Sequence, residues 1–377
     1  MVNERDTQYL LLTPGPLSTT RTVREAMMQE HSTWDIDYNS IVQSIRERLV
    51  RLATDDAARH TAALMPGSGT FAVESVIGSV IPPDGKLLVL NNGAYGARIT
   101  RISQMLGIDT IELGQAEIES TDLGQVEQKL AGDSAITHVA MVHCETTTGM
   151  LNPVEAVGEI VRRLGRVFIL DAMSSFGGIP MSMESTGAHY LISSANKCVQ
   201  GVPGFGFVVA DRATLEVTKG WARSHSLDLF DQWREMETKG GKWRFTSPTH
   251  VVSAFARALD ELEAEGGVNA RHSRYVANQK TMVEGMRGIG FRTLIEDEVQ
   301  SPIITSFYYP DAAEFEFQKF YDALKERGFV IYPGKVSHAQ CFRIGSIGDV
   351  HPEDMIELVG HVAKVLEEMG VNLVVSS

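Results

Sequence analysis

One lysine separates two short apolar runs in the stretch Tyr190-Leu-Ile-Ser-Ser-Ala-Asn-Lys197-Cys-Val-Gln-Gly-Val-Pro-Gly-Phe-Gly-Phe-Val-Val-Ala210. Glycines at positions 201, 204 and 206 turn the chain sharply before the second run, Phe207-Val208-Val209. A lysine at the mouth of a strand can present its amine to a bound carbonyl, and desolvation there lowers its pKa and makes it a better nucleophile. Taken alone, the pattern also fits a surface lysine in a loop.

A carboxylate ends another apolar run upstream of this lysine, in Arg166-Val-Phe-Ile-Leu-Asp171-Ala-Met-Ser-Ser175. A buried parallel strand has this form when it delivers an aspartate to the ligand-binding edge of a sheet. An aspartate and a lysine at two strand ends are what pyridoxal phosphate requires. The carboxylate keeps the pyridine nitrogen protonated, and the amine forms the Schiff base. A structural ion pair between Asp171 and Lys197 is the alternative.

The composition is that of a soluble globular enzyme with room for two domains. The chain has 377 residues, of which 43% are hydrophobic and 22% charged. Its 34 basic and 48 acidic side chains give a net charge of −14, which argues against nucleic acid or an anionic membrane as a partner. An acidic protein must therefore bind an anionic substrate through a local basic pocket.

The cellular location is inferred from the N-terminus, the apolar runs and the cysteines. Residues Met1 to Gln8 have no hydrophobic signal-peptide core, and no apolar run approaches the length of a membrane span. The three cysteines, Cys144, Cys198 and Cys341, lie in or beside expected strands. Reduced thiols in a cytoplasmic protein fit this pattern best.

Strands alternate with helices through the first two thirds of the chain. This alternation predicts an α/β domain on a mostly parallel sheet. Expected strands are 62–65, 86–92, 109–112 and 137–143, and expected helices are 21–30, 39–53, 73–81, 95–106, 122–131 and 153–164.

The rhythm changes after about Pro248, where the pattern predicts a smaller α+β domain. One long helical stretch is expected over 249–287, strands near 302–309, 329–332 and 341–345, and helices near 317–324 and from Pro352 onward. We place the large domain at 17–255 and the small domain at 256–377, with residues 1–16 joining the small one.

Polar groups that could hold a phosphate and a flat ring follow two of the expected strands. Gly67-Ser68-Gly69-Thr70 offers backbone N–H groups, two hydroxyls and a helix N-terminus, which together form a phosphate cradle. A plain tight turn is one alternative. A dinucleotide fingerprint is another, but the next strand ends in Asn91-Asn92 where that motif expects an acid. Tyr95 could stack on a heteroaromatic ring or serve as a packing residue.

Two further candidates lie at other strands. Thr146, in His143-Cys-Glu-Thr-Thr-Thr-Gly149, could reach the cofactor's phenolic oxygen or phosphate, and capping is the alternative role for these threonines. We expect His143 to be a satisfied buried histidine. Arg343 alternates with Phe342 and Ile344, so it faces away from the core and suits a carboxylate or phosphonate. An exposed surface arginine is the alternative. No spacing of His, Cys, Asp and Glu resembles a metal site.

With these segments assembled, the chain resembles the class V aminotransferases of fold type I almost end to end, from Leu12-Thr-Pro-Gly-Pro16 to the last helix. The resemblance implies a seven-stranded type of sheet, pyridoxal 5'-phosphate as cofactor, and Lys197 and Asp171 as catalytic residues. Ser68, Gly69 and Thr70 would hold the phosphate, Tyr95 would stack on the ring, Thr146 and Asn196 would line the site, and Arg343 with Gly15 would bind substrate. Trp243 and Thr246 match a segment that in relatives reaches the neighbouring subunit's phosphate site, which implies a homodimer with shared active sites.

Within the family, the quoted segments are most similar to the members that transfer the amino group of 2-aminoethylphosphonate to pyruvate, in phosphonate catabolism. The resemblance therefore implies an amine donor and a 2-oxo acid acceptor. An alanine– or serine–glyoxylate transaminase is the near alternative. A cysteine desulfurase-like lyase is more distant, because it needs a cysteine on a mobile loop whereas Cys341 lies in an apolar strand. A non-catalytic pyridoxal phosphate sensor is disfavoured because there is no basic helix-turn-helix extension.

Overall fold

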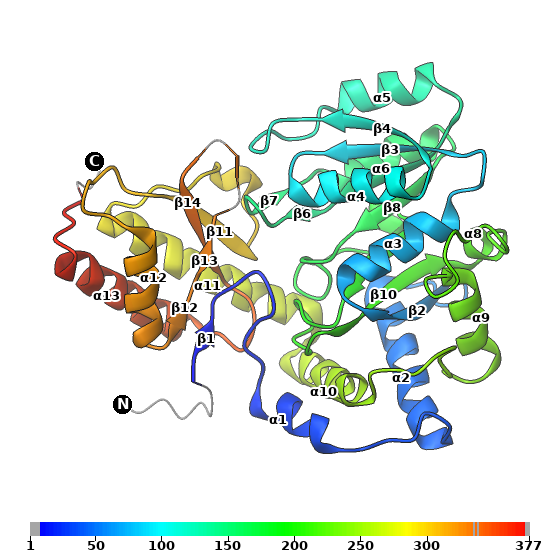
Figure 1. Ribbon diagram of the computed structural model, residues 1–377, viewed down its shortest axis with the longest axis horizontal. Coiled ribbons are helices and arrows are strands. Elements are labelled where there is room, and N and C mark those ends of the chain that lie inside the picture. The colour runs from blue at the N-terminus through cyan, green and yellow to red at the C-terminus, as the bar shows by residue number, and fades with distance from the viewer. Residues whose placement is uncertain (1–7, 335, 338, 374–377) are drawn as a thin grey trace.

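A seven-stranded sheet forms the centre of the larger part of the computed structural model, which describes residues 8–334, 336–337 and 339–373 (Figure 1). The strand order is β2-β10-β9-β8-β5-β3-β4, and only β10 runs antiparallel to its neighbours. The mostly parallel sheet predicted from the sequence is confirmed. Its strands are β2 (His60–Gly67), β3 (Lys86–Asn91), β4 (Asp109–Gly114), β5 (Ile136–Val142), β8 (Val167–Asp171), β9 (Tyr190–Ser194) and β10 (Gly204–Asp211).

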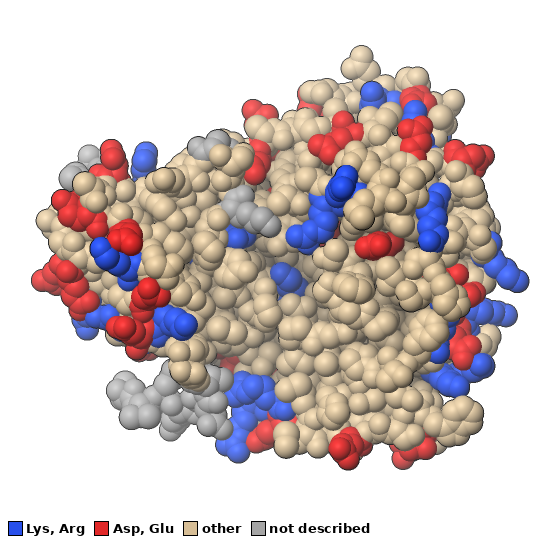
Figure 2. Space-filling model, in the orientation of Figure 1, with Lys and Arg blue, Asp and Glu red and all other residues tan. Residues whose placement is uncertain are grey.

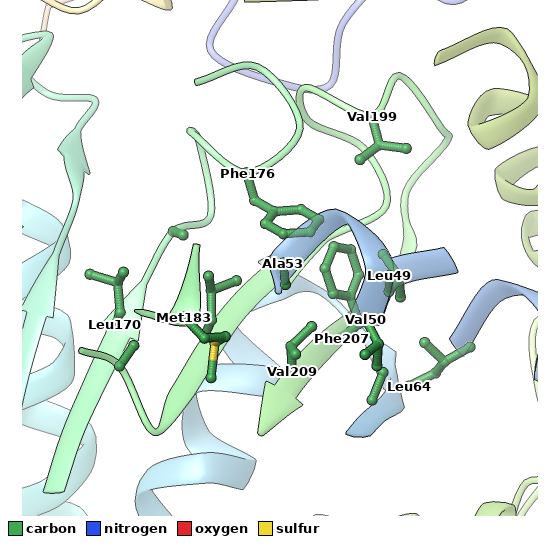
Figure 3. Packing of buried hydrophobic residues seen from close by; sticks show 14 of the residues in the cluster. Leu49, Val50, Ala53, Leu64, Leu170, Phe176, Met183, Val199, Phe207 and Val209 are labelled. Carbon is green, nitrogen blue, oxygen red and sulfur yellow. The ribbon is translucent and has the colours of Figure 1, made fainter. Parts of the chain in front are cut away.

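Helices cover both faces of this sheet, because successive residues of each strand point to opposite faces. In β2, Ala62 and Leu64 belong to one apolar cluster, whereas Ala63 and Met65 belong to the other. Figure 3 shows Leu64 and Phe207 in the first cluster, with side chains of α2. The first face is covered by α2 (Ile36–Ala53), α5 (Leu123–Gly132), α6 (Val154–Arg163) and α10 (Thr249–Glu265), and the second by α3 (Gly69–Val80), α4 (Ala94–Met105) and α9 (Leu229–Thr238).

The smaller part has its own apolar core around an antiparallel sheet of order β11-β14-β13. The N-terminal strand β1 (Leu10–Leu11) pairs in parallel with β12 (Phe329–Val330), so this segment packs with the smaller part. The other elements here are β11 (Ile304–Tyr308), β13 (Tyr332–Pro333), β14 (Cys341–Gly345), α11 (Gly267–Ile289), α12 (Phe317–Glu326), α13 (Pro352–Glu368) and the 3-10 turn η2 (Asp297–Val299).

The prediction of one helix over 249–287 is wrong. The structure has two helices, α10 and α11, which are separated at Gly266, with φ +108°, and Gly267, the first residue of α11, has φ +78°. Left-handed backbone ends an α-helix, and glycine adopts it without a Cβ penalty.

Smaller differences concern short elements. The helix expected over 21–30 ends early, as α1 (Arg21–Glu25) followed by the 3-10 turn η1 (Ala26–Met28), and the strand expected near 329–332 is split into β12 and β13. The structure also contains α7 (Met183–Thr186), α8 (Arg212–Glu216) and the small hairpin β6 (Cys144–Glu145) and β7 (Met150–Leu151). The inference about a signal peptide rests on Met1 to Thr7, which lie outside the described residues.

The state of the cysteines and the length of the apolar helices are properties of the described structure as a whole. The three cysteines are buried free thiols. Within the part of the chain that the structure describes, no helix is both long and apolar enough to cross a membrane.

Candidate active site

Asp171 and Lys197 come from adjacent strands and line the same cavity. Asp171 is the last residue of β8 and pairs with Ile192 of the parallel strand β9, and Lys197 follows the end of β9. Both side chains are buried, at 4% and 8% exposure. The carboxyl ends of parallel strands meet at one edge of a sheet, and ligands bind there in open α/β sheets.

The cavity between these residues has a volume of about 170 Å³. Three larger hollows on the described structure are lined by none of the residues proposed for the site from the sequence. Seven of the predicted site residues line the smaller cavity: Ser68, Gly69, Thr70, Tyr95, Asp171, Asn196 and Lys197.

Burial changes the protonation of both ionisable residues. Loss of water lowers the pKa of the Lys197 amine to about 8. Desolvation also raises the pKa of Asp171 to about 6, although its carboxylate accepts a hydrogen bond from the Met173 N–H at 2.9 Å. A minor fraction of the Lys197 amine is therefore neutral near neutral pH, far more than for an exposed lysine, and Asp171 still carries most of its negative charge at pH 7.

The N-terminus of α3 forms one wall of the cavity. Ser68 is the N-cap residue, but its hydroxyl makes no capping hydrogen bond, so it is available to a ligand. The first N–H groups of an α-helix have no partner within the helix, which makes Gly69 and Thr70 donors for an anion. The hydroxyl of Thr70 accepts a hydrogen bond from Arg98 Nη1 at 3.2 Å.

Arg98 is a site residue that sequence reasoning missed. Its guanidinium lies over the Tyr95 ring, 4.7 Å from the centroid, and both side chains line the cavity. Arg98 stands about one helical turn after Tyr95 on α4, so helical spacing was a usable signal. Figure 2 shows Lys and Arg side chains along the hollow between the two parts of the molecule, which agrees with the local basic pocket expected in an acidic protein.

The N-terminal segment lies directly on the lysine. Lys197 Nζ donates a hydrogen bond to the carbonyl of Pro14. A Cβ atom on Gly15 would lie 2.9 Å from the same nitrogen. The structure therefore brings Gly15 to the site, as predicted for a substrate-binding residue, through contact with the amine.

Arg343 is 3% exposed, which excludes the alternative of a surface arginine. Its Nη1 donates to the carbonyl of Thr146 at 2.8 Å, and its Nε and Nη2 donate to that of Pro333 at 3.0 and 2.9 Å. Burial lowers its pKa. Arg343, on β14 of the small part, therefore links Thr146 of the large part to Pro333 on β13. Neither residue lines the 170 Å³ cavity itself.

Trp243 and Thr246 do not join the other residues in this chain. The Trp243 ring is 4% exposed and packs edge-to-face on Phe205 at 6.1 Å, inside the sheet core. Thr246 is exposed, three positions along the same segment. The ring of Trp243 therefore anchors the segment, which leaves Thr246 as the member that could reach another molecule.

His143 matches the expectation of a satisfied buried histidine. Its Nδ1 lies 2.9 Å from Ser175 Oγ, and burial lowers its pKa to about 4. A neutral ring of that kind supports the strand end and does not act as a general acid at neutral pH.

The side chains of the cavity suit an organic ligand with three distinct groups. The α3 N-terminus and Arg98 suit a phosphate, Asp171 suits a protonated ring nitrogen, and Lys197 suits a carbonyl carbon. Among the described residues, no group of three or more His, Cys, Asp and Glu side chains is placed to hold a metal ion.

Comparisons with known proteins agree with this geometry. The family model described as aminotransferase class V matches residues 26–343. The chain is 59% identical to the 2-aminoethylphosphonate–pyruvate transaminase of Vibrio vulnificus (strain CMCP6), over 95% of this chain and 98% of that protein. It is 60% identical to the protein of the same name from Syntrophobacter fumaroxidans, over 96% and 97% of the two chains.

Solved structures with the same fold are more distant in sequence. The ureidoglycine–glyoxylate aminotransferase of Bacillus subtilis has a TM-score of 0.89 at 22% identity, over 97% of this chain and 95% of that one. The pyridoxamine–pyruvate aminotransferase of Mesorhizobium loti also has a TM-score of 0.89 at 22% identity, over 99% and 95%. At this identity the likeness shows the fold alone.

Proposed function

The chain belongs to the class V aminotransferases, and from that premise we propose that it transfers the amino group of 2-aminoethylphosphonate to pyruvate, with pyridoxal 5'-phosphate as cofactor. The donor becomes phosphonoacetaldehyde and pyruvate becomes L-alanine, a step of phosphonate degradation. The observation that carries the proposal is the meeting of Asp171 and Lys197 in one cavity under the N-terminus of α3. The named relatives, at 59% and 60% identity, supply the choice of substrates.

The residues of the cavity would hold the cofactor at each of its functional groups. Ser68, Gly69 and Thr70, with Arg98 behind them, would bind the phosphate, and Asp171 would keep the ring nitrogen protonated. Tyr95 would lie against the ring, Asn196 would line the cavity, and Lys197 would hold the cofactor covalently. Thr146 lies outside the cavity and would contribute through its contact with Arg343. When bound, pyridoxal phosphate supplies a ring that accepts the electrons released at the substrate carbon next to nitrogen.

Lys197 acts as the general acid and base of this reaction. Its pKa of about 8 lets the amine take a proton from the substrate carbon and return it at physiological pH. The buried position keeps competing water away from the same proton, because the N-terminal segment covers the amine at Pro14 and Gly15.

Arg343 binds the anionic end of each substrate in turn, first a phosphonate and then a carboxylate. A guanidinium presents several N–H donors in one plane and suits both anions. Its present acceptors are the carbonyls of Thr146 and Pro333, which an incoming anion would replace in part.

We further propose a cytoplasmic homodimer in which the segment carrying Trp243 and Thr246 reaches the partner's phosphate site. Large apolar side chains on the surface support a second copy: Trp34 is 78% exposed, Ile36 79% and Phe245 46%. Burying apolar surface of this kind is the main favourable term in protein association.

The separate cores support the proposed division into a large domain, 17–255, and a small domain, 256–377 with 1–16, although Ala258 and Leu259 of α10 still pack in the sheet core. The smaller core holds Leu10 and Leu12 and then residues from Met282 onward, while both sheet cores end before Gly266.

A panel of donors and acceptors tests the function. Enzyme loaded with pyridoxal phosphate is mixed with 2-aminoethylphosphonate, L-alanine or L-serine, and loss of the visible band of the lysine-bound cofactor is followed. Product is then measured with pyruvate or glyoxylate as acceptor. We expect 2-aminoethylphosphonate with pyruvate to be the fastest pair and Lys197→Ala to lose both the band and turnover. Faster turnover of serine with glyoxylate would contradict the proposed substrates.

A further inference from the structure

Glu145 is a fully buried carboxylate that the reaction described above does not use. It lies in the hairpin strand β6 and has 0% exposure. Its Oε1 accepts hydrogen bonds from the N–H and the hydroxyl of Thr147, at 3.2 and 2.6 Å. Its Oε2 accepts a hydrogen bond from the N–H of Tyr95 at 3.2 Å. A buried carboxylate with both oxygens in use has a defined structural task, because leaving it unpaired would be costly.

That task is to cap a helix from another segment of the chain. The N-cap position of α4 is Gly93, which has no side chain to accept a hydrogen bond from the first turn. A Cβ atom on Gly93 would lie 2.4 Å from Glu145 Cδ, so glycine leaves the room that the carboxylate occupies. Negative charge at a helix N-terminus is favourable because it faces the free N–H groups and the positive end of the helix dipole.

The capped turn carries two side chains of the cofactor cavity. Tyr95 donates its own N–H to Glu145, and Arg98 follows on the same helix with its guanidinium over the Tyr95 ring. The position of the aromatic ring and of the cation that contacts Thr70 therefore depends on where this turn is held.

The hairpin that contains Glu145 also contacts the substrate-binding arginine. Thr146, the next residue, accepts the hydrogen bond from Arg343 Nη1 at 2.8 Å. The hairpin is closed by the Gly149 N–H, which donates to the Glu145 carbonyl at 2.8 Å. One short segment thus holds the start of α4 on one side and Arg343 on the other.

We propose that Glu145 is a positioning residue: its carboxylate caps α4 from the β6 hairpin and so fixes Tyr95 and Arg98 against the cofactor. The inference rests on the proposed cofactor, and its test measures binding of pyridoxal 5'-phosphate as well as turnover. Loss of the cap would move the start of α4. Tyr95 would then bind the cofactor ring less tightly, and Arg98 would bind the cofactor phosphate less tightly.

Glu145→Gln is the principal variant. A carboxamide has one acceptor oxygen and one donor nitrogen, so it can satisfy Thr147 or Tyr95 but not both. We expect the dissociation constant for pyridoxal phosphate, from absorbance or fluorescence titration, to rise about tenfold to a hundredfold. We also expect the absorption maximum of the bound cofactor to shift, because the Tyr95 ring, which would lie against the cofactor, moves in this variant. If Glu145→Gln is insoluble, Thr147→Val removes only the hydroxyl that anchors Oε1, and a rise of about threefold is expected.

A double-mutant cycle separates positioning from general loss of stability. If Glu145 acts through Tyr95, Glu145→Gln should weaken binding much less in a Tyr95→Ala background than in the wild type. Asp211→Asn is the matched control. Asp211 is also buried and caps α8 by accepting from the N–H and hydroxyl of Thr214, both at 2.9 Å, but it lies outside the cavity. The Asp211→Asn variant should lower thermal stability and leave the affinity for pyridoxal phosphate unchanged.

The outcomes distinguish this inference from the proposed function. Wild-type protein that does not bind pyridoxal phosphate would end the proposed function itself. Wild-type binding with an unchanged dissociation constant in Glu145→Gln overturns the positioning role alone. Additive effects of Glu145→Gln and Tyr95→Ala would overturn the part of the role that acts through the Tyr95 ring.

Discussion

A methyl group on Gly15 would lie 2.9 Å from Lys197 Nζ and 2.8 Å from its Cδ. The N-terminal segment therefore lies against the end of the Lys197 side chain, from Cδ to the amine nitrogen. Gly15 also has φ +121°, which side-chain-bearing residues rarely adopt. Lys197 belongs to the sheet edge of the large part, whereas the chain before Gly15 pairs with the small part through β1 and β12. The contact therefore joins the two parts of the molecule at the reactive nitrogen.

Gly15→Ala should reduce turnover far more than it reduces stability. The added methyl group displaces the amine, whereas the strain of a positive φ costs about 1–3 kcal/mol wherever it occurs. We expect kcat to fall at least about tenfold, since misplacing a reacting group by even an ångström has such effects. Steady-state assays and thermal unfolding measure the two quantities.

Gly107→Ala is the control for backbone strain. Gly107 has φ +69°, and a Cβ atom there would meet nothing within 4 Å. This variant should lose stability and keep kcat. Equal loss of kcat in both variants would remove the special role of the Gly15–Lys197 contact.

Asp171→Asn should make the cofactor-free protein more stable at neutral pH. Burial raises the Asp171 pKa from 3.8 to about 6, so the charge is favoured less in the folded state than in the unfolded state. The contribution of Asp171 to stability is thus fully present below about pH 4 and is lost as the pH rises through 6. Above pH 7, removal of the charge should stabilise the fold by about 1–3 kcal/mol.

Urea unfolding of both proteins at several pH values checks this sign. The difference should be largest above pH 7 and shrink toward pH 4, while the variant loses transamination. The carboxamide introduced by Asp171→Asn can still accept the hydrogen bond from the Met173 N–H, so that contact is a constant in the comparison. A variant that is less stable than wild type at pH values above 7 would contradict the direction of the pKa shift.

The parts of the site that were predictable share one property: the signal is local in sequence. Asp171 and Lys197 each end an apolar run, and Ser68 to Thr70 stand between a strand and a helix, so their place at one sheet edge follows from the parallel topology. Only the resemblance to a family connected Gly15 with the same cavity, because nothing in the local pattern relates positions 15 and 197.

The parts that were missed depend on contacts between distant segments. Glu145 caps a helix through the N–H of Tyr95, which lies 50 positions earlier, and an acid in a threonine-rich turn carries no sign of that partner. Trp243 was expected at an interface, and only the tertiary structure shows its ring inside the sheet core. The break is visible in the sequence as the pair Gly266-Gly267, a signal that the expectation of a single helix did not use.

Arg343→Lys should weaken binding of both substrates and leave cofactor binding intact. Three guanidinium nitrogens now hold two carbonyls, those of Thr146 and Pro333, and a single ammonium cannot keep that planar arrangement. We expect kcat/KM to fall about a hundredfold or more for donor and acceptor alike, with an unchanged dissociation constant for pyridoxal phosphate.

Arg292→Lys serves as the matched control for the arginine variant. Arg292 is exposed, and its guanidinium lies 5.5 Å from the ring centroid of Tyr308 on β11, the strand that pairs with β14. The Arg292→Lys variant should not change any kinetic constant. A selective loss for pyruvate, with 2-aminoethylphosphonate unaffected, would show that the phosphonate binds elsewhere.

Mixing two inactive variants should restore activity if neighbouring subunits share active sites. Lys197→Ala removes the amine from its own cavity, and Thr246→Glu places a negative charge where Thr246 would meet the partner's phosphate. In a mixed dimer, one site then combines an intact Lys197 from one subunit with an intact Thr246 from the other. Random exchange makes half of the dimers mixed, each with one of two sites working, so we expect about a quarter of wild-type activity.

Lys197→Ala mixed with Asp171→Asn is the control, because both residues line the cavity of their own subunit and no mixed site is complete. Recovery in the control pair, or none in the test pair after proven subunit exchange, would contradict the shared site.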